Sequence, residues 1–316
     1  MKCLVAGGAG FIGSHLCEAL LSKGDEVFCL DNFITGSKKN IEHLENNPKF
    51  HLIEWDVIKP LDSAISHQLS AISSIYHLAS PASPVQYQKY PIETLLANSL
   101  GTHHLLELAK EYGAKFLYAS SSEIYGNPQQ HPQTESYWGN VNPIGVRSCY
   151  DEGKRFGEAM MMAYVRKYDL DGRIGRIFNT YGPRMEKNDG RVISNFVNQA
   201  IEGKPFTVYG DGTQTRSFCF ISDMIGGLIT LMEKEKARGE VFNLGNPEEH
   251  TILEIAKIVK KLAASTSEIK FTDLPEDDPT RRCPDITRAK QILGWQPKIT
   301  LEEGLKKTIV YFRRFL

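Results

Sequence analysis

The sequence of 316 residues has no long apolar run and no excess of charge of either sign. A helix needs about 18 consecutive apolar residues to cross a bilayer, and no stretch reaches that length. The 37 basic residues are balanced by 38 acidic ones, so the net charge of −1 does not draw the chain to nucleic acid or to an anionic membrane. The composition therefore predicts a globular protein in which any anionic ligand is held by a local group of positive charges.

Cysteine is scarce and irregularly spaced. The six cysteines, at positions 3, 17, 29, 149, 219 and 283, form no C-x-x-C pair, and no His/Cys cluster has metal-ligand spacing. We therefore expect no metal site and reduced thiols in a buried core. A basic and apolar leader with a cleavage site is also not visible, so we expect a cytoplasmic location.

Short apolar runs alternate with amphipathic stretches in the first half of the chain. Strands are predicted at 2–6, 27–30, 50–55, 75–79 and 115–119, and helices at about 11–23, 92–112 and 150–168. Several of these runs are apolar nearly throughout, as parallel strands buried on both faces should be. The alternation predicts an α/β fold of the Rossmann type, with a doubly wound parallel sheet.

The second half predicts a smaller C-terminal α/β domain for the substrate. Helices are expected at about 191–202, 222–235, 251–264 and 300–315, with short strands at 206–208, 215–220 and 240–244. A soft boundary near residue 180 divides the chain into 1–180 and 181–316, with segments that interleave. The polar, proline-rich stretch 275–284 is predicted to be a loop.

A glycine-rich turn follows the first predicted strand and opens the first helix. Gly7, Gly10 and Gly13 let the chain turn tightly and bring backbone N–H groups close to a pyrophosphate. Asp31, at the end of the second strand, would accept a hydrogen bond from a ribose 2′-hydroxyl and repel a 2′-phosphate. This pattern predicts NAD rather than NADP. Asp56, after the third strand, would either meet the adenine or cap a loop.

Tyr150 and Lys154 are four residues apart, so on a helix they share one face. A free tyrosine has a pKa of about 10, and a neighbouring ammonium and the positive nicotinamide ring both favour its phenolate, which would make Tyr150 usable for proton removal. A serine from Ser120–Ser122, at the end of the preceding strand, can bond the same substrate oxygen. These groups would meet at the carboxyl ends of parallel strands, where open α/β sheets bind ligands.

These features resemble the extended short-chain dehydrogenase/reductase family. Longer stretches resemble, within it, the UDP-glucuronate decarboxylases, also called UDP-xylose synthases. The stretches are His77–Val85, Ser120–Gly126, Glu135–Gly145, Arg147–Arg155, Arg176–Met185, Asp189–Phe196, Val208–Phe218 and Asn243–Glu254.

The resemblance implies a reaction with no net redox change. Tyr150 would take the proton from the sugar 4-hydroxyl while C4 gives a hydride to NAD, and Ser121 would share the bond to that oxygen. The 4-keto uronate would lose CO₂, with Glu123 beside C5 and Arg282 associated with decarboxylation and reprotonation, before the hydride returns to C4. A closed site would keep the intermediate from solvent. Read without the family, Glu123 could simply cap a turn, and Arg282 could be solvated.

The predicted site has three parts. The catalytic residues are Tyr150, Lys154, Ser121, Glu123 and Arg282. The cofactor-binding residues are Gly7, Gly10, Phe11, Ile12, Gly13, Asp31, Asn32, Asp56, Val57, Leu78, Ala79, Ser120, Tyr150, Lys154, Thr180 and Arg191. The substrate-binding residues are Ser121, Glu123, Asn179, Asn195, Tyr209, Arg216 and Arg282, with the stretch 193–197, and the arginines among these residues suit the UDP diphosphate because guanidinium offers paired donors.

Two positions depart from the family pattern. Leu96 stands where these decarboxylases carry a lysine that contacts substrate, and leucine cannot donate to a carboxylate. Cys283 stands where lysine is frequent. The departure at Leu96 bears on which sugar is bound and leaves the NAD chemistry intact.

Related functions are the main alternatives. A 4-epimerase would flip the 4-keto intermediate, and a 4,6-dehydratase would use an Asp-Glu pair where this chain has Ser122-Glu123. A non-catalytic NAD-sensing module would lack the Tyr150 and Lys154 pair. The resemblance also implies a homodimer through a four-helix interface built from the helices near 92–112 and 150–168, where methionines 160–162 suit an interface and a core equally well.

Overall fold

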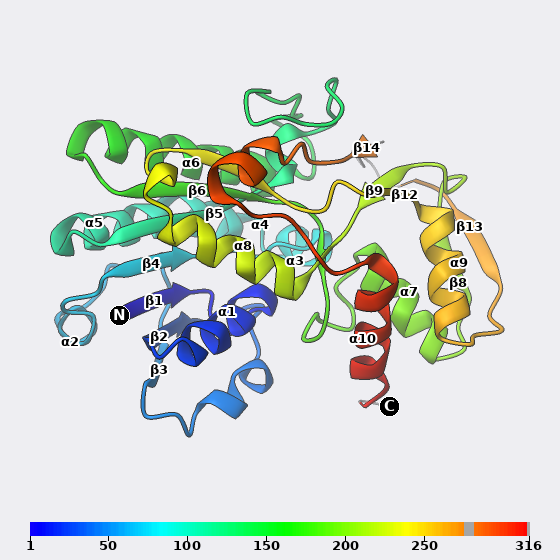
Figure 1. Ribbon diagram of the computed structural model, residues 1–316, viewed down its shortest axis with the longest axis horizontal. Coiled ribbons are helices and arrows are strands. Elements are labelled where there is room, and N and C mark those ends of the chain that lie inside the picture. The colour runs from blue at the N-terminus through cyan, green and yellow to red at the C-terminus, as the bar shows by residue number, and fades with distance from the viewer. Residues whose placement is uncertain (275–280, 315–316) are drawn as a thin grey trace.

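A seven-stranded parallel sheet organises most of the chain in the computed structural model, which describes residues 1–274 and 281–314 (Figure 1). In sheet order its strands are β3 (Phe50–Glu54), β2 (Glu26–Asp31), β1 (Lys2–Ala6), β4 (Ser74–His77), β5 (Lys115–Ser121), β6 (Gly172–Ile177) and β11 (Val241–Leu244). Every neighbouring pair is parallel. The order reverses direction between β1 and β4, which is the point where doubly wound sheets bind their ligands.

Helices cover both faces of this sheet. They are α1 (Phe11–Ser22), α2 (Ser63–Gln68), α3 (Pro84–Lys89), α4 (Pro91–Leu96), α5 (Thr102–Tyr112), α6 (Ser148–Tyr168) and α8 (Ile221–Glu233). A π-helical segment, Ala97–Gly101, joins α4 to α5. Short 3₁₀ turns lie at Lys38–Asn40, Glu42–Leu44, Ser122–Tyr125 (η4) and Glu235–Ala237.

Alternate residues of each strand pack against opposite layers of helices. Cys3 and Val5 of β1 join a buried cluster with α1 and α8, whereas Leu4 and Ala6 join a second cluster with α5 and α6. Because successive side chains of a strand point to opposite faces, a run that is apolar throughout fits a sheet covered on both sides. The near-continuous apolar pattern of the early strands has this cause.

A smaller group of elements lies at one side of the sheet, beyond the strand ends (Figure 1). Its helices are α7 (Val192–Ile201), α9 (Ile252–Leu262) and α10 (Leu301–Arg313), whereas the π-helical segment Ala289–Leu293 packs against β11 of the large sheet. Its short strands pair as β10 (Cys219–Phe220) with β7 (Thr180–Tyr181), as β12 (Glu249–Thr251), β9 (Thr215–Ser217) and β14 (Arg281–Arg282), and as β13 (Ile269–Thr272) with β8 (Phe206–Tyr209). The predicted α/β fold class is confirmed.

Several elements differ from the sequence prediction. The single helix expected at 92–112 is three consecutive segments, and the strand expected at 215–220 is divided between β9 and β10. The strand β6 was not predicted, because its glycines and arginines interrupt the apolar pattern. The strand β11 comes from the second half of the chain, so the two parts interleave, and the boundary near residue 180 remains an interpretation.

The described residues contain no helix that is both long and apolar enough to cross a membrane. Within the same ranges, no three His, Cys, Asp or Glu side chains are grouped so that they could hold a metal ion. All six cysteines are buried and unpaired, as the sequence predicted.

Candidate active site

The glycine-rich turn between β1 and α1 lines a large cavity. Gly7 has a φ of 81°, a conformation that other residues rarely adopt. A Cβ added at Gly13 would lie 2.1 Å from the carbonyl oxygen of Gly7, so glycine is needed for this close approach. Gly10 precedes α1 without a side-chain cap, which leaves the first N–H groups of the helix available to an anion. The turn is therefore suited to a pyrophosphate.

A smaller hollow adjoins this turn at the end of β2. Asp31 and Asn32 line it together with Asp56 and Val57. The Asp31 carboxylate accepts hydrogen bonds from the N–H groups of Ala9, at 2.9 Å, and of Phe33, at 2.8 Å. Burial raises the pKa of Asp31, and these two bonds oppose the rise.

Asp56 has a structural partner on each side. It accepts hydrogen bonds from the N–H of Ile58 and from the Asn32 side chain, both at 3.0 Å. Asp56 thus caps its own loop and also lines the smaller hollow beside Asp31, so the two interpretations of this residue are compatible.

The Tyr150 and Lys154 pair lies near the start of α6, and both side chains are buried. The Lys154 ammonium donates to the carbonyl of Ala119 at 2.8 Å and lies 5.7 Å from the centre of the Tyr150 ring. Burial raises the pKa of Tyr150 to about 12, although a hydrogen bond with Ser121 opposes the rise. Burial also lowers the pKa of Lys154 to about 7.

These shifts correct the expectation that the ammonium makes the phenol acidic. That expectation came from spacing alone and left out burial, which disfavours the charged form of both groups. In the structure burial is the largest cause of both shifts, and the pKa of neither group is moved by the other. Without a further positive charge beside it, Tyr150 is therefore protonated at neutral pH.

Glu123 is held between two arginines. The residue is the second of the 3₁₀ turn η4, and its N–H donates to the Ser121 hydroxyl at 3.2 Å. Its carboxylate forms ion pairs with Arg147 and Arg282. Burial raises the pKa of Glu123, but the two guanidinium groups outweigh burial and lower it to about 2. The side chain is therefore ionised at neutral pH.

Arg282 is buried, contrary to the solvated alternative for an arginine in a polar loop. It lies on β14, which pairs with β9 and sets Arg282 beside Arg216 in register. Besides Glu123, its guanidinium donates to the Ser122 hydroxyl at 3.3 Å and to the Gly126 carbonyl at 2.8 Å. These contacts connect β14, in the C-terminal part of the chain, to the turn that carries Glu123.

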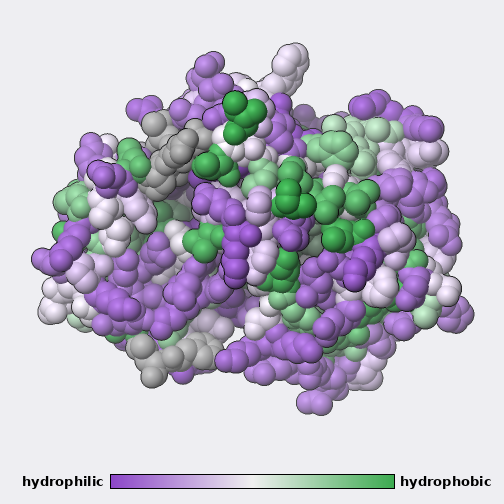
Figure 2. All heavy atoms as spheres, turned by 180° about the vertical axis from the view of Figure 1, so that it is seen from behind, coloured by the Kyte–Doolittle hydropathy of each residue, from purple (hydrophilic) through white to green (hydrophobic). Residues whose placement is uncertain are grey.

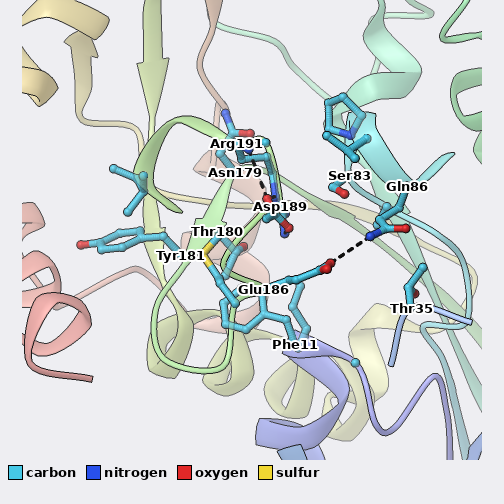
Figure 3. Close-up of a pocket in the computed structure, with 18 of the residues that line it drawn as sticks. Phe11, Thr35, Ser83, Gln86, Asn179, Thr180, Tyr181, Glu186, Asp189 and Arg191 are labelled. Atoms are coloured by element: carbon cyan, nitrogen blue, oxygen red, sulfur yellow. Dashed lines mark hydrogen bonds and ion pairs between the residues drawn. The ribbon is translucent and has the colours of Figure 1, made fainter. Parts of the chain in front are cut away.

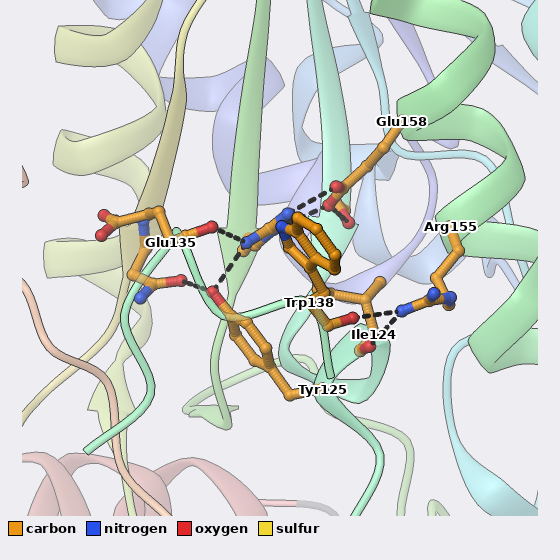
Figure 4. A network of polar contacts seen from close by, with 9 residues as sticks. Ile124, Tyr125, Glu135, Trp138, Arg155 and Glu158 are labelled. Atoms are coloured by element: carbon orange, nitrogen blue, oxygen red, sulfur yellow. Dashed lines mark hydrogen bonds and ion pairs between the residues drawn. The ribbon is translucent and has the colours of Figure 1, made fainter. Parts of the chain in front are cut away.

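A polar network behind this turn fixes its position (Figure 4). Arg176 pairs with Glu158 at 2.8 Å and donates to the hydroxyl of Tyr125 at 2.9 Å. Arg155 of α6 donates to the carbonyls of Ile124 and Trp138. The network connects β6, α6 and the loop before α6, so the strand that the sequence analysis missed helps to orient Glu123.

The predicted residues meet around one cavity of about 1140 Å³. Those on its walls are Gly7, Gly10, Phe11, Ile12, Gly13, Leu78, Ser120, Ser121, Glu123, Tyr150, Lys154, Asn179, Thr180, Arg191, Asn195, Tyr209, Arg216 and Arg282. Asp31, Asn32, Asp56, Val57 and Ala79 line the adjoining hollow. Figure 3 shows Asn179, Thr180 and Arg191 across the cavity from Ser83 and Gln86. Residues from both halves of the sequence thus face a single space.

One sequence-based expectation needs adjustment, and the two departures from the family pattern can be placed. Val197 is fully buried in the core rather than facing the cavity, because it lies on the inner side of α7. Leu96 lies outside the set of residues that line the cavity, so its apolar side chain takes no place on the wall. Cys283 is buried, with its thiol against the Pro247 carbonyl at 3.3 Å. Residues 275–280 of the predicted loop lie outside the described residues.

Two wall residues were not singled out from the sequence. Arg147 precedes α6 by one residue and reaches Glu123, while its guanidinium lies 6.0 Å from the centre of the Tyr87 ring. Tyr87 stacks on Tyr150 with ring centres 5.1 Å apart. The i, i+3 spacing of Arg147 and Tyr150 could have indicated the first of these. Asp151 is also buried here, and burial with the nearby Glu123 charge raises its pKa to about 8.

Comparison with known proteins matches this geometry to a family. Residues 4–308 match the profile of the GDP-mannose 4,6-dehydratase family. UDP-glucuronic acid decarboxylase 1 of Danio rerio is 53% identical over 315 residues, covering 100% of this chain and 73% of that protein. UDP-glucuronic acid decarboxylase 4 of Arabidopsis thaliana is 54% identical over 99% of this chain and 69% of that protein.

Solved structures share the fold at lower sequence identity. The UDP-glucuronic acid 4-epimerase of Bacillus cereus, in complex with UDP-glucuronic acid and NAD, has a TM-score of 0.90 and 33% identity, with all of both chains covered. The UDP-glucose 4-epimerase of Thermotoga maritima, with UDP-glucose, has a TM-score of 0.91 and 30% identity, covering 100% of this chain and 99% of that one.

Proposed function

The chain belongs to the GDP-mannose 4,6-dehydratase family and, within it, to the UDP-glucuronic acid decarboxylases, and from this premise we propose that it converts UDP-glucuronate to UDP-xylose with NAD as its cofactor. One observation carries the proposal furthest. Glu123, clamped by Arg147 and Arg282, shares a cavity wall with Ser121 and Tyr150. The ionised acid thus stands beside the group that removes a proton from the sugar.

The residues present fit NAD. The glycine turn comes so close to α1 that a Cβ at Gly13 would meet backbone, which leaves room for a pyrophosphate against the helix. Asp31 offers carboxylate oxygens at the hollow where an adenosine ribose would lie, and a 2′-phosphate would be repelled there. The nicotinamide of bound NAD would accept a hydride from C4 of the sugar and later return it.

Tyr150, Ser121 and Lys154 would manage the proton on the 4-hydroxyl. Tyr150 removes that proton as C4 is oxidised, and Ser121 shares the hydrogen bond to the same oxygen. Lys154, fixed to the Ala119 carbonyl, would supply a charge near the phenol and the cofactor ribose. To take this proton Tyr150 must first be ionised, and since burial raises its pKa to about 12, the positive charges of Lys154 and of the bound nicotinamide ring would have to offset that rise.

The 4-keto sugar carries its carboxylate β to the ketone, so it loses CO₂ as its electrons pass into an enolate, and C5 of that enolate would then take a proton from water before the hydride returns to C4. Tyr150, still protonated, would donate to the enolate oxygen together with Ser121. Arg147 and Arg282 would provide positive charge beside the reacting carbons. Since the pKa of Glu123 is lowered to about 2, this residue would hold the two guanidinium groups in place and would not act as a proton donor.

A second candidate is a UDP-uronate 4-epimerase, favoured by the likeness to the Bacillus cereus enzyme. A 4,6-dehydratase fits less well, because Ser122 stands where that chemistry needs an Asp beside Glu123. A non-catalytic NAD-sensing module would not need the buried Tyr150 and Lys154 pair.

The test is to incubate the purified protein with NAD and UDP-glucuronate and to analyse the products. Release of CO₂ with formation of a UDP-pentose is the expected result. If UDP-galacturonate were the sole product, the chain would be a 4-epimerase and the proposed decarboxylase function would be wrong. A 4-keto UDP-pentose without UDP-xylose would mean that the intermediate leaves before the hydride returns.

We further propose a cytoplasmic homodimer that associates through α4, α5 and α6. Ile92, Leu100 and Phe156 of this region are exposed although they are hydrophobic. Figure 2 shows hydrophobic residues gathered near the middle of the face opposite that of Figure 1. The six buried, unpaired thiols suit a reducing compartment. Sedimentation of the protein and of a Phe156→Glu variant would test the interface.

A further inference from the structure

The loop after β7 is attached to the N-terminal part of the fold on both sides of the cofactor cleft. Its residues Pro183–Glu186 are called the strap from here on, and three of them, Arg184, Met185 and Glu186, line the same cavity as the glycine turn. The neighbouring backbone supports a fixed path, because Gly182 has a φ of 154° and Arg184 a φ of 67°. A residue other than glycine keeps a positive φ only where its surroundings hold it there.

One end of the strap is tied to α1. The ring of His15 donates to the Pro183 carbonyl at 3.0 Å. Arg184 forms an ion pair with Glu18 and also donates to the ring of His43 at 3.2 Å. The contacts with His15 and Glu18 are partly buried, whereas the contact with His43 is exposed. They attach the strap to the helix whose first turn is suited to the cofactor pyrophosphate.

The middle of the strap is anchored in the core. Met185 is 4% exposed and belongs to the apolar cluster that includes α7 and α10. Because displacing Met185 would expose apolar surface, this part of the strap resists opening.

The other end reaches across to α3. The side-chain amide of Gln86 donates to the Glu186 carboxylate at 2.9 Å, and Glu186 is exposed (Figure 3). Figure 3 shows this bond above Phe11 and Thr35, which line the cofactor part of the cavity. A single exposed hydrogen bond can break without uncovering a core, so this end can open while the α1 end stays fixed.

We propose that the strap closes over bound NAD and that the Gln86–Glu186 bond is its releasable end, which sets how fast the cofactor leaves. This rests on the proposed function, because only a resident dinucleotide needs retention. A reaction that removes a hydride and later returns it fails if the reduced cofactor escapes between the two steps. A strap with one permanent and one releasable attachment keeps the cofactor in place during turnover and still allows loading.

The experiment measures release of NADH from the loaded holoenzyme. Wild type and the variants Gln86→Ala, Glu186→Ala, Glu186→Gln and the double alanine variant are loaded with NADH and mixed with excess NAD, and the loss of nucleotide fluorescence is followed. We expect Gln86→Ala and Glu186→Ala to release NADH about tenfold faster, a change typical of one lost hydrogen bond to a charged group. Glu186→Gln keeps an acceptor and should release NADH at close to the wild-type rate.

The double variant distinguishes the bond from two separate effects. If the two side chains act through their mutual contact, the double variant releases NADH as fast as each single one. The proposal would be overturned if the double variant released NADH at the product of the two single-variant accelerations. It would also be overturned if both single variants released NADH at the wild-type rate, or if Glu186→Gln released it as fast as Glu186→Ala. Failure of wild type to bind NADH would instead overturn the proposed function.

Discussion

The cofactor end and the sugar end of the cavity are built by different means. The cofactor end consists mainly of backbone that is continuous in sequence, from Gly7 to the first turn of α1. The sugar end consists of charged side chains brought together from afar: Arg147 lies 24 residues from Glu123, and Arg282 lies 159 residues from it. One end thus depends on close backbone approach, and the other on mutual neutralisation of buried charges.

This contrast teaches which end defines the chemistry. A glycine turn with an acid after the second strand suits any dinucleotide enzyme and says little about the substrate. The Glu123 clamp sets a carboxylate and two guanidinium groups beside Tyr150. This arrangement of charges acts on the sugar carbons that react, so it bears on the substrate. Substitutions at the two ends should therefore have separable effects.

The largest effect is expected where the two ends meet. Tyr150→Phe removes the hydroxyl that takes the proton from the sugar, so hydride transfer should fall by about a thousandfold or more. NAD binding should be retained, because the ring and its stacking on Tyr87 remain. Single-turnover formation of NADH absorbance measures the first quantity, and a fluorescence titration measures the second. Retained turnover would remove Tyr150 from its role.

Breaking the sugar end alone is expected to cost about a hundredfold. Glu123→Gln removes the charge that neutralises Arg147 and Arg282, so both guanidinium groups should shift and CO₂ release should slow. NAD affinity should change by less than about twofold, because the clamp does not touch the glycine turn. The comparison of CO₂ release with NAD affinity is the measurement. An equal loss of both would indicate misfolding.

The same carboxylate should affect stability at low pH. The pKa of Glu123 is lowered from its usual 4.5 to about 2. A group with a depressed folded pKa contributes stability above its unfolded pKa, and this contribution is lost as the pH falls from 4.5 toward 2. The free energy of unfolding, measured with denaturant across that range, should fall more steeply with decreasing pH for wild type than for Glu123→Gln. Equal pH dependence of the two proteins would contradict the clamp.

Breaking the cofactor end alone should give the reverse pattern. Gly13→Ala places a Cβ 2.1 Å from the Gly7 carbonyl oxygen, so the turn must widen. We expect NAD affinity to fall about tenfold and stability by about 1–3 kcal/mol. At saturating NAD, CO₂ release should recover, and a rate that stays low would show that the two ends are not separable.

The difference between the ends also explains what could be predicted from sequence. The positions of Gly7 and Gly13 at the turn before α1, and of Asp31 at the end of β2, could be predicted. The pattern that indicates them is local, and its spacing is fixed by one strand and one helix. Tyr150 and Lys154 were predicted as a pair for the same reason.

The charges at the sugar end depend on tertiary contacts that no local pattern reports. Arg147 was missed because its partner lies on another element, and the direction of the Tyr150 pKa shift was missed because burial is not visible in spacing. The strand β6 was missed because its two arginines interrupt the apolar pattern: Arg176 belongs to the polar network and Arg173 pairs with Asp171. Buried charge is the feature that the sequence conceals here.

The smallest effect is expected at the departure from the family. Leu96→Lys restores the family residue at a position that does not line the cavity, so CO₂ release should change by less than about threefold. Steady-state kinetics with UDP-glucuronate measures this. A tenfold or larger gain in CO₂ release would show that α4 also contacts the sugar. It would then weaken the proposal that Arg147 and Arg282 supply the positive charge beside the reacting carbons.

The central claim is that one site removes a hydride from C4 and returns it to the same sugar. UDP-glucuronate carrying deuterium at C4 tests this most directly, with the product analysed by mass spectrometry after complete conversion in the presence of excess unlabelled NADH. The account predicts UDP-xylose that retains its deuterium at C4. Product that has exchanged the label for hydrogen would contradict it.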